Sequence, residues 1–118
     1  MTFAKWLPAV LLSIAASTSA LALNFSFLNN AAVSYFSNGD YKLMESAADQ
    51  ALDQGKDGQK ITWKNPNTTA WGYFIPKNTT RKNGVVCRNL TIFNSAKDVT
   101  GLATYPFCKL NGDWKIVN

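Results

Sequence analysis

The chain has 118 residues, with twelve Lys and Arg against seven Asp and Glu, two Cys and no His. Its length corresponds to one domain at most. Without histidine, Ser–His and Cys–His catalysis and His-containing metal sites are excluded, and Glu45 is the only glutamate available for acid–base chemistry. We therefore expect a non-catalytic protein with no cofactor and no metal.

Residues 1–22 have the organisation of a secretory signal peptide. Lys5 precedes an uncharged, largely apolar stretch at residues 6–16, and Ala-Leu-Ala at 20–22 supplies the small residues of a cleavage site. The apolar stretch is about half of the roughly 20 residues that a membrane-spanning helix needs. We predict cleavage after Ala22, a mature chain that is not a transmembrane protein, and no nucleic-acid partner, because the protein is exported.

The next segment, residues 23–37, has no steady period. Phe25 and Phe27 alternate as in a strand, whereas Leu28, Ala32 and Phe36 fit one face of a helix. We leave its conformation open and treat it as an N-terminal segment that is a candidate for docking on a partner. The folded domain is expected at residues 38–118.

An amphipathic helix is predicted over about residues 40–54. Capping residues stand at 37–40, and acidic residues near this end suit the helix dipole. Gly55 is placed to end the helix. The apolar residues recur at spacings of three and four: Tyr41, Met44, Ala48, Ala51 and Leu52.

Five short β-rich runs follow, at residues 61–63, 71–75, 85–94, 102–110 and 114–117. Asn65-Pro66-Asn67 separates the first two, and Asn83-Gly84 and Asn111-Gly112 are strong hairpin signals. Together these patterns predict an α+β fold in which one N-terminal helix packs on a five-stranded antiparallel meander.

The two cysteines fix a register for the third and fourth strands. Cys87 and Cys108 are equidistant from a midpoint between Lys97 and Asp98, so a hairpin about that point places them opposite each other. A disulfide between them would close a loop of about 20 residues and stabilise the chain by about 3 kcal/mol. The same register opposes Leu90 to Tyr105 and Arg88 to Phe107, and we expect Arg88 to pair with Asp98 or Asp113.

Several C-terminal motifs resemble the surface-antigen domain of the rickettsial 17 kDa outer-membrane antigen family. The resemblance covers about residues 36–117. It is carried by the Trp-x-Asn-Pro sequence at 63–66, Gly72, Pro76, Gly84, Cys87-Arg88, Cys108 and the run Asn111-Gly112-Asp113-Trp114-Lys115-Ile116-Val117.

This resemblance implies a small, exported bacterial envelope domain, located in the periplasm or at the outer membrane, without known catalysis. Members of that family often carry a lipoprotein cysteine and a glycine-rich apolar region ahead of the domain, and this chain has neither. We therefore predict that it is not a lipoprotein and that it associates with the envelope through partner proteins. Related small domains look like accessory pieces of larger assemblies, including secretion machinery.

Aromatic and basic side chains are the candidates for partner contact. Alternation places Trp71, Tyr73 and Ile75 on one face of a strand and Phe74 on the other. Both faces of this strand are apolar, so each must pack against another part of the protein or a partner. Aromatic residues of a small domain usually form its core, and clustered lysines are usually a solvated surface. The alternative is contact with an envelope protein, an anionic lipid or a cell-wall polymer. The candidate contact residues are Trp71, Phe74, Phe25, Phe27, Lys77, Arg81 and Lys82.

Two functions follow from these observations. The first is a structural or accessory subunit of an outer-membrane-associated complex such as secretion machinery. The second is a periplasmic binding or inhibitor module for a cell-wall polymer or an enzyme.

Overall fold

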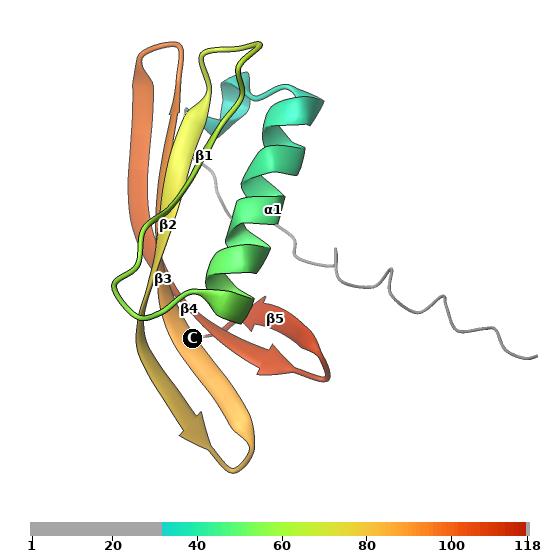
Figure 1. Cartoon of the computed structure of the whole chain (residues 1–118), viewed down its shortest axis with the longest axis vertical. Coiled ribbons are helices and arrows are strands. Elements are labelled where there is room, and N and C mark those ends of the chain that lie inside the picture. The colour runs from blue at the N-terminus through green and yellow to red at the C-terminus, as the bar shows by residue number, and fades with distance from the viewer. Residues whose placement is uncertain (1–31, 118) are drawn as a thin grey trace, which may run out of the picture.

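A computed structural model describes residues 32–117 of the chain, in which one α-helix lies across one face of a curled, five-stranded antiparallel sheet (Figure 1). The strands follow each other in chain order, β1-β2-β3-β4-β5. The predicted architecture of one helix followed by a five-stranded meander is therefore confirmed. The signal peptide, Phe25 and Phe27 lie outside the described residues. The described part of the N-terminal segment contains a 3-10 turn, η2 (Val33–Tyr35).

Helix α1 (Asn38–Gln54) begins two residues before the predicted start and ends where expected. Its buried side chains are one turn apart, at Asp40, Met44, Ala47, Ala48, Ala51 and Leu52, which is the pattern that a helix packed on a sheet requires. Gly55 does end the helix, but its φ of −69° is not left-handed. A Cβ there would lie 2.6 Å from the Ala51 carbonyl oxygen and 3.0 Å from Pro76, so glycine is needed for close approach between helix and sheet.

The sheet consists of β1 (Ile61–Lys64), β2 (Trp71–Lys82), β3 (Val85–Ala96), β4 (Val99–Leu110) and β5 (Asp113–Ile116). Two-residue turns join the last four strands. Asn83-Gly84, Lys97-Asp98 and Asn111-Gly112 all have positive φ at both positions, as a type I′ turn demands. The two Asn-Gly hairpins and the midpoint between Lys97 and Asp98 are thus confirmed.

The predicted pairing of β3 with β4 is also confirmed. Cys87 lies opposite Cys108, and their sulfur atoms are bonded at 2.04 Å. Leu90 opposes Tyr105 and Arg88 opposes Phe107, as the symmetry of the cysteines indicated. The disulfide therefore joins two neighbouring strands in the middle of the sheet.

Strand β2 is longer than the five residues expected from the sequence, because it continues through Pro76 to Lys82. A proline lacks the N–H that an interior strand must donate. Strand β1, however, pairs with β2 only as far as Phe74, so the chain at Pro76 is already the edge of the sheet. Its carbonyl oxygen instead accepts a 2.8 Å hydrogen bond from the Gly58 backbone N–H.

The hydrophobic core lies between α1 and the facing side of the sheet. It is centred on Met44 and Leu52 from the helix and on Phe74, Leu90 and Phe107 from the strands, all nearly inaccessible to solvent. Gly72 leaves space on this side, where a Cβ would meet the Trp63 indole nitrogen and the side chain of Asn94. Within residues 32–117, no helix has the length and hydrophobicity to span a membrane.

Candidate functional site

The sheet has two faces of different character, and we call them the helix face and the outer face. On β3, every second residue from Arg88 to Ala96 points to the helix face and is buried. The residues between them point to the outer face, which α1 leaves uncovered (Figure 1). Each face carries one candidate site.

Aromatic side chains gather on the outer face. Thr62, Tyr73, Phe93 and Leu102 stand in one row across β1 to β4. The rings of Tyr73 and Phe93 are stacked 5.0 Å apart, and the ring of Trp71 lies 5.1 Å from that of Phe93. Trp71 is 38% exposed and Leu102 is 66% exposed, so this apolar cluster reaches solvent.

Lysines surround this aromatic cluster. The Lys60 ammonium group lies 4.3 Å from the centre of the Tyr73 ring, close enough for a cation–π interaction. Lys64 pairs with Trp71 across the strands, and Lys77 follows further along β2. The outer face is therefore an aromatic surface with a basic rim.

Phe74 does not belong to this surface, and its assignment as a contact residue is wrong. Alternation points it to the helix face, where no part of its surface is exposed. Trp71, by contrast, lies where a partner can reach it. The sequence placed these two residues on opposite faces, but it did not show which face the helix covers.

A β-bulge separates the three basic residues predicted to act together. Two residues of β2, Asn78 and Thr79, lie between the paired positions Lys77 and Thr80, where β3 has one. Asn78 takes a φ of 53°, which asparagine tolerates better than most residues. The extra residue shifts the alternation, so Arg81 points to the helix face while Lys77 and Lys82 point to the outer face.

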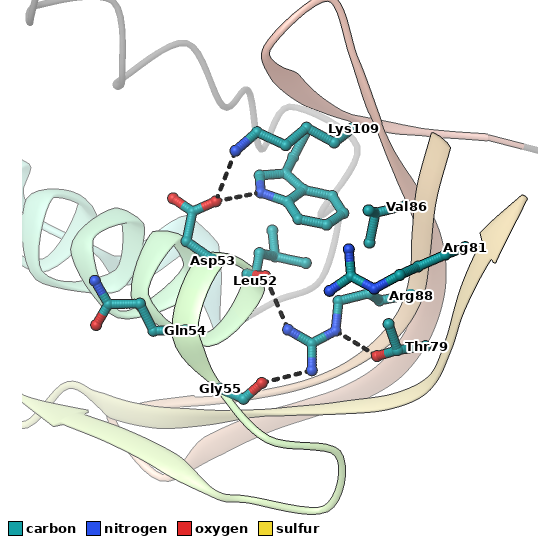
Figure 2. A pocket seen from close by; sticks show the side chains of 10 residues that line it. Leu52, Asp53, Gln54, Gly55, Thr79, Arg81, Val86, Arg88 and Lys109 are labelled. Carbon is teal, nitrogen blue, oxygen red and sulfur yellow. Dashed lines mark hydrogen bonds and ion pairs between the residues drawn. The ribbon is translucent and has the colours of Figure 1, made fainter. Parts of the chain in front are cut away.

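On the helix face, a hollow of about 370 Å³ opens at the C-terminal end of α1. Figure 2 shows it between the last turn of the helix, the part of β2 beyond the bulge, the start of β3, and the β4–β5 hairpin. Its polar lining includes Arg81, Arg88 and Lys109, and its apolar lining is Leu52, Val86 and Trp114.

Arg88 joins the helix to the sheet at this hollow. Its Nη1 donates to the carbonyl oxygens of Ala51 (3.0 Å) and Leu52 (2.8 Å), and its Nη2 donates to that of Gly55 (2.6 Å). The Ala51 and Leu52 carbonyls lie in the last turn, at the negative end of the helix dipole, and that of Ala51 also accepts a 3.1 Å hydrogen bond from the Gly55 N–H. The side chain is only 7% exposed, so the charge is held almost entirely by these bonds.

The remaining donors of Arg88 are also used. Its Nε donates to Thr79 Oγ1 at 2.7 Å, and Nη2 lies 3.1 Å from Asp57 Oδ1. The expectation that Arg88 pairs with Asp98 or Asp113 is therefore wrong. Both carboxylates belong to hairpin turns or the β4–β5 edge, whereas Asp57 is brought to Arg88 by the loop that follows α1.

Thr79 fixes Asp57 in turn, since its hydroxyl and its backbone N–H both donate to that carboxylate. These two hydrogen bonds, followed by that of Arg88, hold the pKa of Asp57 below its usual value. The bulge is what points Thr79 toward the helix face. One irregular residue in β2 thus supplies the link between Arg88 and the loop.

The opposite wall of the hollow is held by Asp53. Its Oδ1 accepts hydrogen bonds from Trp114 Nε1 at 2.8 Å and from Lys109 Nζ at 3.3 Å. These contacts connect the end of α1 to the β4–β5 hairpin. Because they are made by the side chains that face the hollow, they keep the indole of Trp114 in its wall.

A second buried charge, Asp40, lies at the N-terminal end of α1. Its Oδ2 accepts from the Ser37 N–H, and its Oδ1 accepts from Asn65 and from Thr68, each bond being 2.8 Å long. The Ser37 hydroxyl accepts from the Asp40 N–H and completes a capping box. Burial by itself raises the pKa of Asp40, but these hydrogen bonds outweigh it and leave the pKa lowered.

The described residues contain no group of three His, Cys, Asp or Glu side chains that could hold a metal ion. Within the described residues, the two sites present an aromatic surface, a cation–π contact and arginine hydrogen bonds. The hollow was missed by sequence reasoning. Its residues come from α1, β2, β3, β4 and β5, and the only local signal was the basic hairpin around Asn83-Gly84.

Comparison with known proteins gives a distant relationship. The chain is 32% identical to the 17 kDa surface antigen of Rickettsia prowazekii over 85 residues, which is 67% of this chain and 51% of that protein. It is 31% identical to the 17 kDa surface antigen of Rickettsia rickettsii over the same length, and 36% identical to that of Rickettsia australis over 53 residues, 44% of this chain and 34% of that protein.

The chain spans about half the length of the first two of these relatives. No protein-family model matches it. No solved structure matches it either. The relationship is thus a distant homology to proteins named surface antigens, and the similarity suggested by the tryptophan, glycine and cysteine motifs is supported at that level.

Proposed function

We propose that this chain is a non-catalytic protein of the bacterial cell envelope, and that the outer face of its sheet docks on a larger envelope protein. The observation that carries the proposal is the aromatic cluster of Trp71, Tyr73 and Phe93, which lies on the face that α1 does not cover. Its homology to surface antigens supports an exported location.

The side chains of the outer face suit a protein interface. Trp, Tyr and Phe are enriched at the centres of such interfaces because they bury a large area at a small entropic cost. Leu102, at 66% exposure, extends the cluster onto β4, and the lysines of the rim favour a partner with acidic groups around an apolar centre.

More specifically, we propose that the chain is an accessory subunit of an outer-membrane-associated complex such as secretion machinery. The alternative is a periplasmic module that binds a cell-wall polymer or inhibits an enzyme. An aromatic surface with lysines also suits a glycan, so this second function rests on the same residues. The two differ in whether the protein is recovered with stoichiometric protein partners.

Photocrosslinking tests the docking face. A photoreactive amino acid is placed at Trp71 or Leu102, and at Leu43 as a control, since Leu43 is an apolar helix residue of the same 38% exposure as Trp71. In detergent-solubilised envelopes, positions 71 and 102 should crosslink to the same envelope protein and position 43 should not. Recovery of the free monomer from all three positions would overturn the subunit function, and retention on isolated cell wall would favour the alternative.

Export needs a separate test, because the signal peptide lies outside the described residues. If residues 1–22 direct export, the protein recovered from a bacterial envelope should begin at Leu23 by intact-mass and N-terminal analysis. Its mass should also be about two hydrogens below that of the dithiol, because Cys87 and Cys108 are joined. A chain that keeps Met1 and stays in the cytoplasmic fraction would contradict the envelope location.

A further inference from the structure

We propose that the hollow at the C-terminal end of α1 is a binding site for a carboxylate that carries a small apolar group, with Arg81 as the residue that receives it. This site lies on the helix face, opposite the docking surface proposed above. It does not depend on the identity of any envelope partner.

Two arginines line the hollow, and their side-chain N–H groups are used to different extents. Arg88 has five N–H groups, and each has an acceptor: Thr79, Ala51, Leu52, Gly55 and Asp57. Arg81 lines the same hollow (Figure 2), but its side chain makes no hydrogen bond or ion pair with any residue from 32 to 117. Arg81 is therefore a planar, two-pronged donor group that is ready to bind an external acceptor.

The charge around Arg81 favours an anion. Both carboxylates near the hollow are already engaged, Asp57 by Arg88 and Thr79 and Asp53 by Lys109 and Trp114. Because Arg88 is paired with Asp57 and Lys109 with Asp53, Arg81 is the basic side chain of this lining that has no carboxylate partner among the described residues, and it favours an anion. A dianion such as phosphate would meet the charges of Asp53 and Asp57 as well, so a singly charged carboxylate fits this balance better.

The remaining walls define the rest of the ligand. Leu52, Val86 and the indole of Trp114 face the cavity and offer apolar contact. A volume of about 370 Å³ is near the lower end for ligand pockets, and it suits one amino-acid residue. The structure thus favours either the C-terminal residue of a polypeptide or an acidic side chain, two sources of the same chemistry.

Nuclear magnetic resonance of the purified, oxidised protein tests the site. The probes are N-acetyl-phenylalanine with a free carboxylate, N-acetyl-phenylalanine amide, N-acetyl-glutamate α-amide and inorganic phosphate. We expect saturable shifts of the Arg81 Nε–H and Trp114 indole N–H signals with the first probe, and at least about tenfold weaker binding of the neutral amide. The glutamate probe separates the two sources, because it binds as well as the first only if a side-chain carboxylate suffices.

Two variants make the assignment specific. Arg81→Met should weaken the carboxylate probe by about tenfold or more, whereas Lys82→Met removes the same charge from the outer face and should leave the affinity unchanged. Equal binding of acid and amide, equal effects of the two variants, or tighter binding of phosphate would each overturn the proposal. Absence of any saturable shift would overturn it too, while leaving the outer-face function standing.

Discussion

The two ends of α1 are joined to the rest of the molecule in different ways. At the N-terminal end, Asp40 belongs to the helix itself and accepts hydrogen bonds from Ser37 and from the β1–β2 loop. At the C-terminal end, the charge is Arg88 of β3, which is 37 positions away from Ala51 in the sequence. The N-terminal tie thus begins as a local capping motif, whereas the C-terminal tie exists only once the sheet has formed.

The two ends also differ in how open they are to solvent. At the N-terminal end, the carboxylate of Asp40 is surrounded by its donors and is 2% exposed. At the C-terminal end, the fully bonded Arg88 forms one side of an open cavity, which leaves Arg81 and Trp114 available beside it. The carboxylate site that we propose depends on this openness, with Arg88 fixed by its hydrogen bonds and the Arg81 side chain left to bind a ligand.

The largest effect is expected from Arg88→Met. This change removes the Arg88 hydrogen bonds to the Ala51, Leu52 and Gly55 carbonyl oxygens and the partner of Asp57, so the free energy of unfolding should fall by about 3–5 kcal/mol. Urea unfolding followed by circular dichroism measures it. Arg81→Met, a neighbouring arginine without such bonds in the described structure, should change stability by less than about 0.5 kcal/mol. Similar losses in the two variants would show that Arg88 does not hold the helix.

Asp40→Ala tests the opposite end and should cost about 2 kcal/mol at pH 7, because it leaves the Ser37 N–H and the Asn65 and Thr68 side chains without their acceptor. The pKa of Asp40 is lowered in the folded state. Its contribution is therefore present above about pH 4 and is lost as the pH falls through the folded-state pKa. The wild type and the variant should converge in stability toward pH 2, and a constant difference from pH 7 to pH 2 would contradict this account.

The features that could be predicted from the sequence are those that depend on residues close together in the chain or on a symmetric hairpin. The helix, its capping residues, the three turns and the facing cysteines depend on spacings within a few residues or on a symmetric hairpin, and these were predicted. Arg88 was assigned to the wrong carboxylates because its partners are set by how the helix end meets β3. Phe74 was misassigned because alternation shows that two faces differ without showing which one is covered. The bulge at Asn78 and Thr79 had no recognised signal, and it changed the direction of Arg81.

Ser37→Ala should have a smaller effect, about 1 kcal/mol, since it removes one hydrogen bond to the Asp40 N–H while the carboxylate keeps its other donors. Ser37→Gly is the matched comparison, because glycine is well tolerated before a helix and should cost only a few tenths of a kcal/mol. Thermal unfolding of both variants distinguishes them. A loss of only a few tenths of a kcal/mol in both variants would mean that the hydroxyl contributes little and that the N-terminal end is held by Asp40 and the loop alone.

The smallest effect is expected at three acidic residues that follow one another along α1, Glu45, Asp49 and Asp53. Partial burial raises the pKa of Asp49 to about 6, and the charges of Asp53 and Glu45, one turn away on either side, add to it. A carboxyl with a raised folded-state pKa stabilises the fold below its ordinary pKa near 4 and loses that contribution as the pH rises through about 6. Asp49→Asn should therefore increase the free energy of unfolding at pH 7 by about 0.5 kcal/mol, a value reduced by the solvent exposure of the group, and should give no gain at pH 3.

Chemical unfolding at the two pH values, with Lys42→Gln as a helix-surface control, measures the difference. An equal increase in the free energy of unfolding at both pH values would show that the amide improves packing or helix propensity. Repulsion among the three acidic residues would then not destabilise the helix.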